Sequence, residues 1–265
     1  MSPRKLPDYN KPPLAEVVMG VRFQPLPGIK VPHYGLFWSK VKEEFPKCQN
    51  APVLGNPVGL EEKETGGLPI PRVWLINEGG DYLIQLQRNH FLFNWRKRGG
   101  VYPRFNSIAP KFYENFKKFQ DFCSENDLGD TVPQSFELSY INHIFSGEGW
   151  KNIKEIGKIF PHLMWKDDQS RYLKELVTTQ WLAEFPMSNP QLGDIRVNVR
   201  HGKKQPEDLP VLVFEIIVRS DTMNGLQKIK QEKWFKSAHD DILWTFEDLT
   251  DDRVQKSFWG KKNGH

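Results

Sequence analysis

The chain has 265 residues, enough for one large domain or two ordinary ones, and 38% of them are hydrophobic and 13% aromatic. This apolar content excludes an intrinsically disordered chain. Lysine and arginine total 37 against 33 acidic residues, and the resulting charge of +4 allows a nucleic-acid partner without implying one.

The first half of the chain predicts one strand, one helix, several antiparallel strands and a long helix. The first strand lies within residues 11–23, where apolar residues recur at every second position. Apolar residues three and four positions apart between Tyr34 and Phe45 predict a helix, and a similar stripe from Phe105 to Cys123 predicts the long one. The further strands are expected at 72–76, 82–87 and 91–95.

The second half of the chain predicts the same order of elements. A strand is expected at 135–144, followed by a helical stretch from Trp150 to Phe160. A last long helix carries apolar residues at a spacing of four between Trp234 and Phe246. Three strands are expected between these helices at 173–185, 194–200 and 211–218, and a short helix near 251–258.

We therefore expect an α+β fold of two similar β-α-β(3-4)-α units. In each unit a curved antiparallel sheet would pack on a long helix, because this arrangement buries one sheet face and one helix stripe. The N-terminal unit is expected at residues 1–130 and the C-terminal unit at 131–265. The two halves share little residue identity, so this internal duplication is inferred from element order alone.

Several features of the sequence predict a cytoplasmic protein. No window approaches 18 uncharged apolar residues, so neither a membrane span nor a membrane partner is expected. The N-terminal residues lack the apolar stretch of a signal peptide. The two cysteines, Cys48 and Cys123, form no CxxC motif, and we expect both to be reduced and buried.

No motif of a known catalytic, metal or nucleotide site is present in the sequence. The glycine pairs Gly79–Gly80 and Gly99–Gly100 lie between strand-like runs and are interpreted as turn glycines. His239 is the histidine best placed for acid–base chemistry, since an adjacent acid, Asp240, would tune its pKa. Local packing in the helix is the more common role for such a histidine.

Two glutamates lie between apolar residues on expected strands. Glu16 and Glu215 would act as an acid and a base if both faced one cleft, with His239 as a third member. Cross-strand ion pairs with nearby arginines explain both residues more simply. We therefore assign no catalytic residue, cofactor or metal, and keep an enzyme with an unrecognised site as an alternative.

A single basic run has aromatic residues interleaved with it. It begins at Arg88 and continues through Trp95 to Arg98. Such a run stacks a base and holds phosphates in nucleic-acid-binding proteins, but it also occurs as the solvated end of a strand with one buried tryptophan. The candidate binding residues are Arg88, Asn94, Trp95, Arg96, Lys97 and His239.

Short motifs that run in order through nearly the whole chain carry a family resemblance. They are Pro12–Val17, Gln85–Arg88, Phe93–Arg96, Tyr102–Phe105, Glu137–Asn142, Trp234, Ala238–His239 and Trp259–Gly260. In these motifs the chain resembles a sporadically distributed family of bacterial proteins of similar length. The resemblance implies a bacterial or phage-borne protein, and a patchy distribution is typical of mobile defence or toxin–immunity cassettes. It brings no established activity and no catalytic residues.

The preferred hypothesis is a non-enzymatic binding or regulatory protein. It would be a partner subunit or immunity-type component of such a cassette, and surplus exposed aromatic residues would contact a protein partner or a second copy of the chain. The alternative is a protein that binds a small ligand or nucleic acid in the groove between sheet and helix, using Trp95 and the neighbouring arginines.

Overall fold

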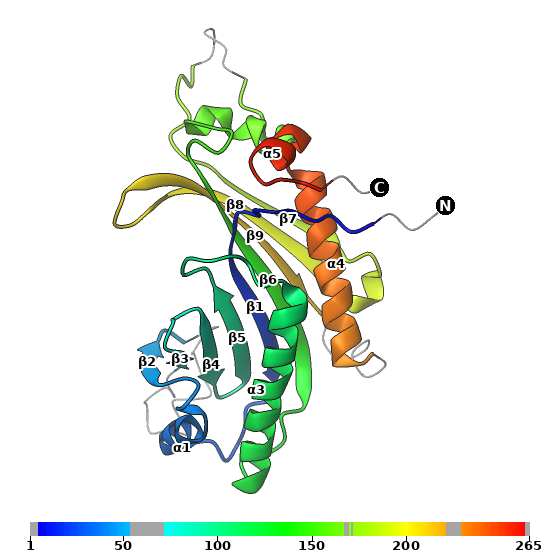
Figure 1. Ribbon diagram of the computed structural model, residues 1–265. Helices are drawn as coiled ribbons and strands as arrows, with labels where there is room; N and C mark the ends of the chain where they lie inside the picture. The colour runs from blue at the N-terminus through cyan, green and yellow to red at the C-terminus, as the bar shows by residue number, and fades with distance from the viewer. Residues whose placement is uncertain (1–4, 54–71, 167–169, 171, 221–228, 263–265) are drawn as a thin grey trace. The chain divides into compact units, whose positions relative to one another are not determined.

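The computed structural model describes residues 5–53, 72–166, 170, 172–220 and 229–262 (Figure 1). Its strands are hydrogen-bonded in the order β2-β3-β4-β5-β1-β6-β9-β8-β7. The chain is therefore an α+β protein with a large open antiparallel sheet, as the alternation of apolar residues predicts. Within the described ranges, no helix is both long enough and apolar enough to span a bilayer.

The chain divides into two compact units. The described residues between 17 and 137 form one, called here the N-terminal unit. Those within 5–16, 138–220 and 229–262 form the other, called here the C-terminal unit. Strands β1 (Leu14–Phe23) and β6 (Pro133–Phe145) contribute residues to both units.

The N-terminal unit contains an antiparallel meander and two helices. Strands β2 to β5 pair in succession, and the turn between β3 and β4 requires the left-handed backbone of Gly80, with φ at 71°. The elements are α1 (Val31–Val41), β2 (Lys47–Ala51), β3 (Arg72–Ile76), β4 (Tyr82–Gln87), β5 (His90–Arg96) and α3 (Phe105–Glu125).

Aromatic side chains fill the core of the N-terminal unit. Phe119 of α3 lies at its centre, with ring centroids 6.0 Å from Phe23, 5.3 Å from Phe37 and 5.6 Å from Phe91. All four side chains are completely buried. Strands β1 and β5 and helices α1 and α3 are therefore held together by apolar contacts around this one ring.

The C-terminal unit combines the later strands with two helices and three short 3₁₀ helices. Helix α4 packs against β9 (Figure 1). Residues 173–179, expected as strand, are not in a ladder, since pairing with β8 begins at Gln180. The elements are η1 (Ile153–Lys158), η2 (Pro161–Leu163), β7 (Gln180–Pro186), η3 (Pro190–Leu192), β8 (Asp194–Lys204), β9 (Leu209–Arg219), α4 (Gln231–Leu249) and α5 (Asp252–Ser257).

The helix expected between Trp150 and Phe160 is replaced by the short 3₁₀ helices η1 and η2. Pro161 keeps the backbone of the preceding Phe160 out of the helical region, with φ at −117° and ψ at 91°, and so separates η1 from η2. Gly157 lies so close to the backbone of Met164 that a Cβ atom at this position would come within 2.8 Å of the Met164 Cα atom. The local apolar spacing is therefore overridden by a tight chain reversal.

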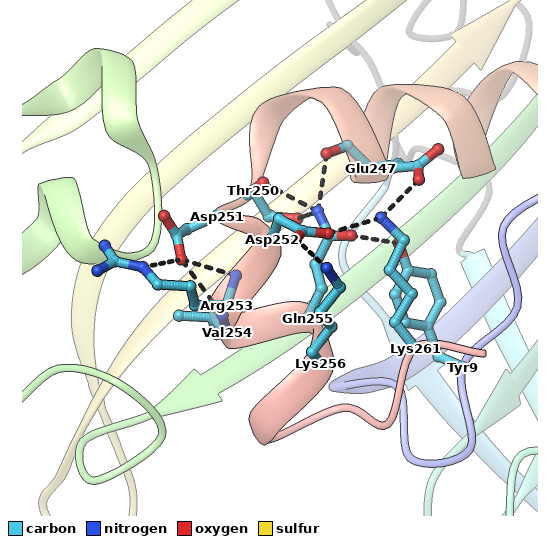
Figure 2. A network of polar contacts seen from close by, with 10 residues as sticks. All are labelled: Tyr9, Glu247, Thr250, Asp251, Asp252, Arg253, Val254, Gln255, Lys256 and Lys261. Atoms are coloured by element: carbon cyan, nitrogen blue, oxygen red, sulfur yellow. Dashed lines mark hydrogen bonds and ion pairs between the residues drawn. The ribbon is translucent and has the colours of Figure 1, made fainter. Parts of the chain in front are cut away.

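A polar network joins the two ends of the C-terminal unit (Figure 2). Tyr9 forms an isolated antiparallel bridge with Lys261, and its hydroxyl donates to Gln255 at 3.2 Å. The Lys261 ammonium lies 2.6 Å from a Glu247 carboxylate oxygen and 3.1 Å from an Asp252 oxygen. The network therefore fastens the N-terminal segment to α4 and α5.

Replacement of Lys261 by methionine should lower the free energy of unfolding by about 2 kcal/mol. The Lys261 and Glu247 side chains are only 18% and 10% exposed, so removal of the cation leaves a poorly solvated carboxylate without its ion pair. Urea denaturation measures the change. Lys262→Met is the matched control, because Lys262 pairs with Asp8 at the surface and its loss should cost less than about 1 kcal/mol. Equal losses in the two variants would contradict the prediction.

Candidate functional site

The candidate residues on β5 divide between the two faces of the strand. Trp95 shares its face with Phe91 and Phe93, the face that packs toward α3, and it is only 3% exposed. Its ring lies 5.3 Å from that of Tyr102. Asn94 and Arg96 point to the opposite face, so they do not share one surface with Trp95.

Asn94 and Arg96 belong to a polar cluster on this opposite face. The guanidinium groups of Arg72 and Arg96 lie 5.6 and 5.7 Å from the Trp74 ring centroid. The Gln85 Oε1 atom accepts from Trp74 Nε1 at 2.9 Å and from Arg72 at 3.0 Å. Gln85 in turn donates to Asn94 Oδ1 at 2.7 Å. The buried amides therefore position the arginines and the indole within the sheet.

The remaining candidates occupy separate places. Arg88 lies between β4 and β5, and its Nε atom donates weakly to the Leu26 carbonyl at 3.4 Å. Lys97 follows β5 and is exposed. His239 lies on α4, where its Nδ1 atom is 3.0 Å from the Tyr140 hydroxyl, and burial lowers its pKa to about 4. The His239 imidazole is therefore neutral at pH 7, as a packing histidine would be.

The hypothetical acid–base site of Glu16, Glu215 and His239 is wrong. The Phe214 ring stacks on Phe246 of α4, so the next residue, Glu215, points to the face away from this helix and from His239. Glu215 accepts instead from Asn198 at 2.8 Å and from Arg200 at 3.1 Å. The cross-strand ion pair expected for Glu215 is confirmed.

The structure also reveals a pocket in the N-terminal unit. It opens beside the turn between β3 and β4 and the segment that follows β5, with a volume of about 350 Å³. Of the candidate residues only Trp95 lines it. In the sequence, the turn glycines Gly79–Gly80 and Gly99–Gly100 are the sign of this pocket. The two turns lie close together because β4 pairs with β5. The lining residues are Gly79, Asp81, Tyr82, Trp95, Arg98, Gly99, Gly100, Val101 and Pro103.

A second feature is the edge strand β7, which ends the sheet. The backbone carbonyl of Thr179 accepts a hydrogen bond from His201, and the backbone N–H of Met187 donates to Gly193. Because the backbone groups of successive residues in a strand point to opposite sides, the odd-numbered residues of β7 bond to β8. The backbone groups of Gln180, Leu182 and Glu184 therefore point away from the sheet. The Leu182 side chain is 68% exposed. The strand therefore presents both backbone hydrogen-bonding groups and apolar surface at the edge of the sheet.

Among the described residues, no group of three or more histidine, cysteine, aspartate or glutamate side chains is arranged to hold a metal ion. The pocket and the edge strand are both suited to binding. Neither a comparison with protein-family models nor one with curated proteins finds a match for this chain.

Proposed function

We propose that this chain is a non-enzymatic binding protein that takes up an extended segment of a protein partner along the edge of β7. The observation that supports this function is the apolar character of the edge strand. Leu182 and Phe185 are 68% and 40% exposed, and the chain leading into the strand exposes Tyr172, Leu173 and Val177. An exposed apolar edge strand is a template for strand addition.

The other edge of the sheet, formed by β2, exposes mostly polar residues, as is typical of an edge that does not pair with another strand. Strand β2 exposes Lys47, Cys48, Gln49 and Asn50, which are polar or charged apart from the cysteine. The burial expected for Cys48 is therefore wrong, whereas Cys123 is buried as expected. Charged and polar residues on an edge strand discourage the addition of another strand. Strand β7 has only Glu184 as a charged residue, and this carboxylate is paired with Arg196 at 2.7 Å. The partner is therefore assigned to the β7 edge.

The edge also defines the chemistry of the occupant. A partner strand would bond to the backbone groups of Gln180, Leu182 and Glu184, which together supply three N–H donors and three carbonyl acceptors. Its side chains would alternate between the face of Leu182 and the face of Trp181 and Phe185. The occupant is thus an extended segment with apolar residues on both faces and no acidic residue opposite Glu184.

The biological setting belongs to the same proposal. The motifs from Pro12 to Gly260 support membership of the sporadic bacterial family that the sequence resembles. On this basis we assign the protein to the cytoplasm, as a partner subunit or immunity-type component of a mobile bacterial or phage defence cassette. An internal duplication, with a sheet on a long helix in each half of the chain, is part of the proposal and is supported by element order.

Leu182→Lys should weaken partner binding at least about tenfold, which corresponds to about 1.4 kcal/mol. A charged side chain at the centre of the edge removes apolar contact and disfavours strand addition. Gln49→Lys is the matched control on the polar β2 edge and should bind normally. The partner is isolated by co-purification from the native host and recombined as a purified protein, with affinity measured by calorimetry and amide protection at Leu182 followed by hydrogen exchange.

Three outcomes decide the proposal. A partner lost with Leu182→Lys, retained with Gln49→Lys and protecting the Leu182 amide supports it. A partner that binds both variants equally overturns it. Self-association of the purified chain that Leu182→Lys abolishes would assign the edge to a second copy and would also overturn it.

A further inference from the structure

Two aromatic residues, Tyr82 and Trp95, line the pocket of the N-terminal unit, and each contacts a further aromatic ring. Tyr82 and Trp95 are directly opposite each other in the β4–β5 ladder. The Tyr82 ring lies 5.7 Å from Phe93, and the Trp95 ring lies 5.3 Å from Tyr102. These neighbours fix both rings before a ligand binds. Trp95 is only 3% exposed and offers little surface to a ligand, so the apolar surface open to one is that of Tyr82, Val101 and Pro103.

Two opposite charges line the same pocket. One Asp81 carboxylate oxygen accepts from Asn77 at 2.7 Å, and Arg98 Nε makes a weak bond of 3.4 Å to the Gly80 carbonyl. Each contact orients its side chain and leaves the second carboxylate oxygen and the two terminal guanidinium nitrogens for other partners. No salt bridge joins Asp81 or Arg98 to a residue within the described ranges.

The glycines of the rim keep the opening free of side chains. Gly99 and Gly100 have φ angles of 87° and 70°, which L side chains rarely adopt. A Cβ atom at either position would meet nothing within 4 Å, so the glycines are required by the backbone conformation and not by crowding. The backbone itself therefore forms this side of the pocket.

The three properties together define a ligand class. An aromatic and apolar wall suits a planar ring, a carboxylate suits hydrogen-bond donors, and a guanidinium suits two neighbouring acceptors. Among the nucleobases, guanine has adjacent donors at N1 and N2 and the acceptors O6 and N7, which arginine recognises in pairs. We propose that the pocket beside the β3–β4 turn binds a guanine base between Asp81 and Arg98. Its volume of about 350 Å³ is sufficient for a ligand of this size.

The surroundings favour a guanine that carries phosphate. Lys97 is exposed next to Arg98 in the chain, and the Lys111 ammonium lies 5.3 Å from the Tyr82 ring centroid. These cations would attract a phosphate attached to the base. A free guanine nucleotide and an unpaired guanine in single-stranded nucleic acid share this chemistry. The inference is independent of the β7 edge, which lies in the C-terminal unit.

Calorimetry on the full chain tests the site with guanosine, inosine, 7-deazaguanosine and adenosine monophosphates. Inosine lacks the N2 donors and 7-deazaguanosine lacks the N7 acceptor, so each should bind about tenfold more weakly than guanosine monophosphate. Tenfold corresponds to about 1.4 kcal/mol, close to the value of one hydrogen bond to a charged group. Adenosine monophosphate should bind at least about a hundredfold more weakly, because it presents a donor where guanine presents O6.

Two conservative variants locate the binding site. Asp81→Asn and Arg98→Met should each weaken guanosine monophosphate binding at least about tenfold. The matched controls are Glu78→Gln, at an exposed acid of the same turn, and Arg253→Met, at an exposed arginine of α5. Both controls should bind as the wild type does. Unchanged circular dichroism would show that each variant is folded.

The outcomes separate the sources of the base and can overturn the inference. Tighter binding of a ten-residue oligothymidine with one central guanine than of the mononucleotide assigns the site to single-stranded nucleic acid. The reverse order assigns it to a free nucleotide. Equal binding of guanosine and adenosine monophosphates, full binding by Asp81→Asn, or no saturable binding of either probe at millimolar concentration overturns the proposal.

Discussion

Replacement of Phe119 by alanine is expected to lower the free energy of unfolding by about 4 kcal/mol. The Phe119 side chain is completely buried, and its ring contacts Phe23, Phe37 and Phe91. These rings come from three different elements besides α3, so the cavity left by the substitution cannot be closed by the movement of one neighbour. Both the lost transfer free energy and the cavity therefore contribute to the change.

Urea denaturation measured by tryptophan fluorescence provides the value, and hydrogen exchange of the β5 amides shows whether the N-terminal unit is the part affected. Phe258→Ala is the matched control, since the Phe258 side chain is 44% exposed and its loss should cost less than about 1 kcal/mol. A loss below about 2 kcal/mol for Phe119→Ala would contradict its central position in the core.

The features that the sequence predicts well are those set by local periodicity. The buried face of β1, with Val17, Met19, Val21 and Phe23, follows from alternation alone. The turn between β3 and β4 follows from its glycines, which permit the required backbone conformation. Neither feature depends on which strand is the neighbour, so the antiparallel α+β class is predictable without knowledge of the strand order.

The features that it predicts poorly depend on partners far along the chain. Residues 173–179 have the composition of a strand, but the ladder with β8 extends only from Gln180 to Pro186. The strand order likewise decides that β7 is an edge, and no local pattern contains this information. The proposed partner surface could therefore be recognised only from the topology.

Residue spacing in the sequence predicts one part of the candidate site, the faces of β5 on which its residues lie, but not the pocket. Asn94, Trp95 and Arg96 are consecutive, and consecutive residues of a strand point to opposite faces, so their separation was implicit in the strand prediction itself. Prediction of the pocket would also have required the pairing register of β4 and β5. Asp81 and Arg98 are 17 positions apart, and they line one pocket because Tyr82 pairs with Trp95 across the β4–β5 ladder. This pairing register is not specified by either strand alone.

Acidification from pH 7 to pH 4 should destabilise the wild-type protein by about 3 kcal/mol more than it destabilises His239→Gln. Burial lowers the pKa of His239 to about 4, whereas an unfolded histidine has a pKa near 6.5. Between these values the unfolded chain binds a proton that the folded chain does not. Stability therefore falls as the pH decreases from about 6.5 to 4, and this contribution is constant at lower pH.

The wild-type protein, His239→Gln and His162→Gln should be compared by urea denaturation at pH 4, 5, 6 and 7. His162 is exposed, so its variant should retain the wild-type acid dependence, while His239→Gln removes the buried imidazole. Burial also raises the pKa of the adjacent Asp240, but this carboxyl is present in all three proteins and cancels in the comparison. The imidazole of His239, whose Nδ1 atom lies 3.0 Å from the Tyr140 hydroxyl, provides a direct check, because its NMR titration should have its midpoint at a pH near 4. An imidazole that titrates near pH 6.5 in the folded protein would show that His239 is open to water and would remove the basis of the prediction.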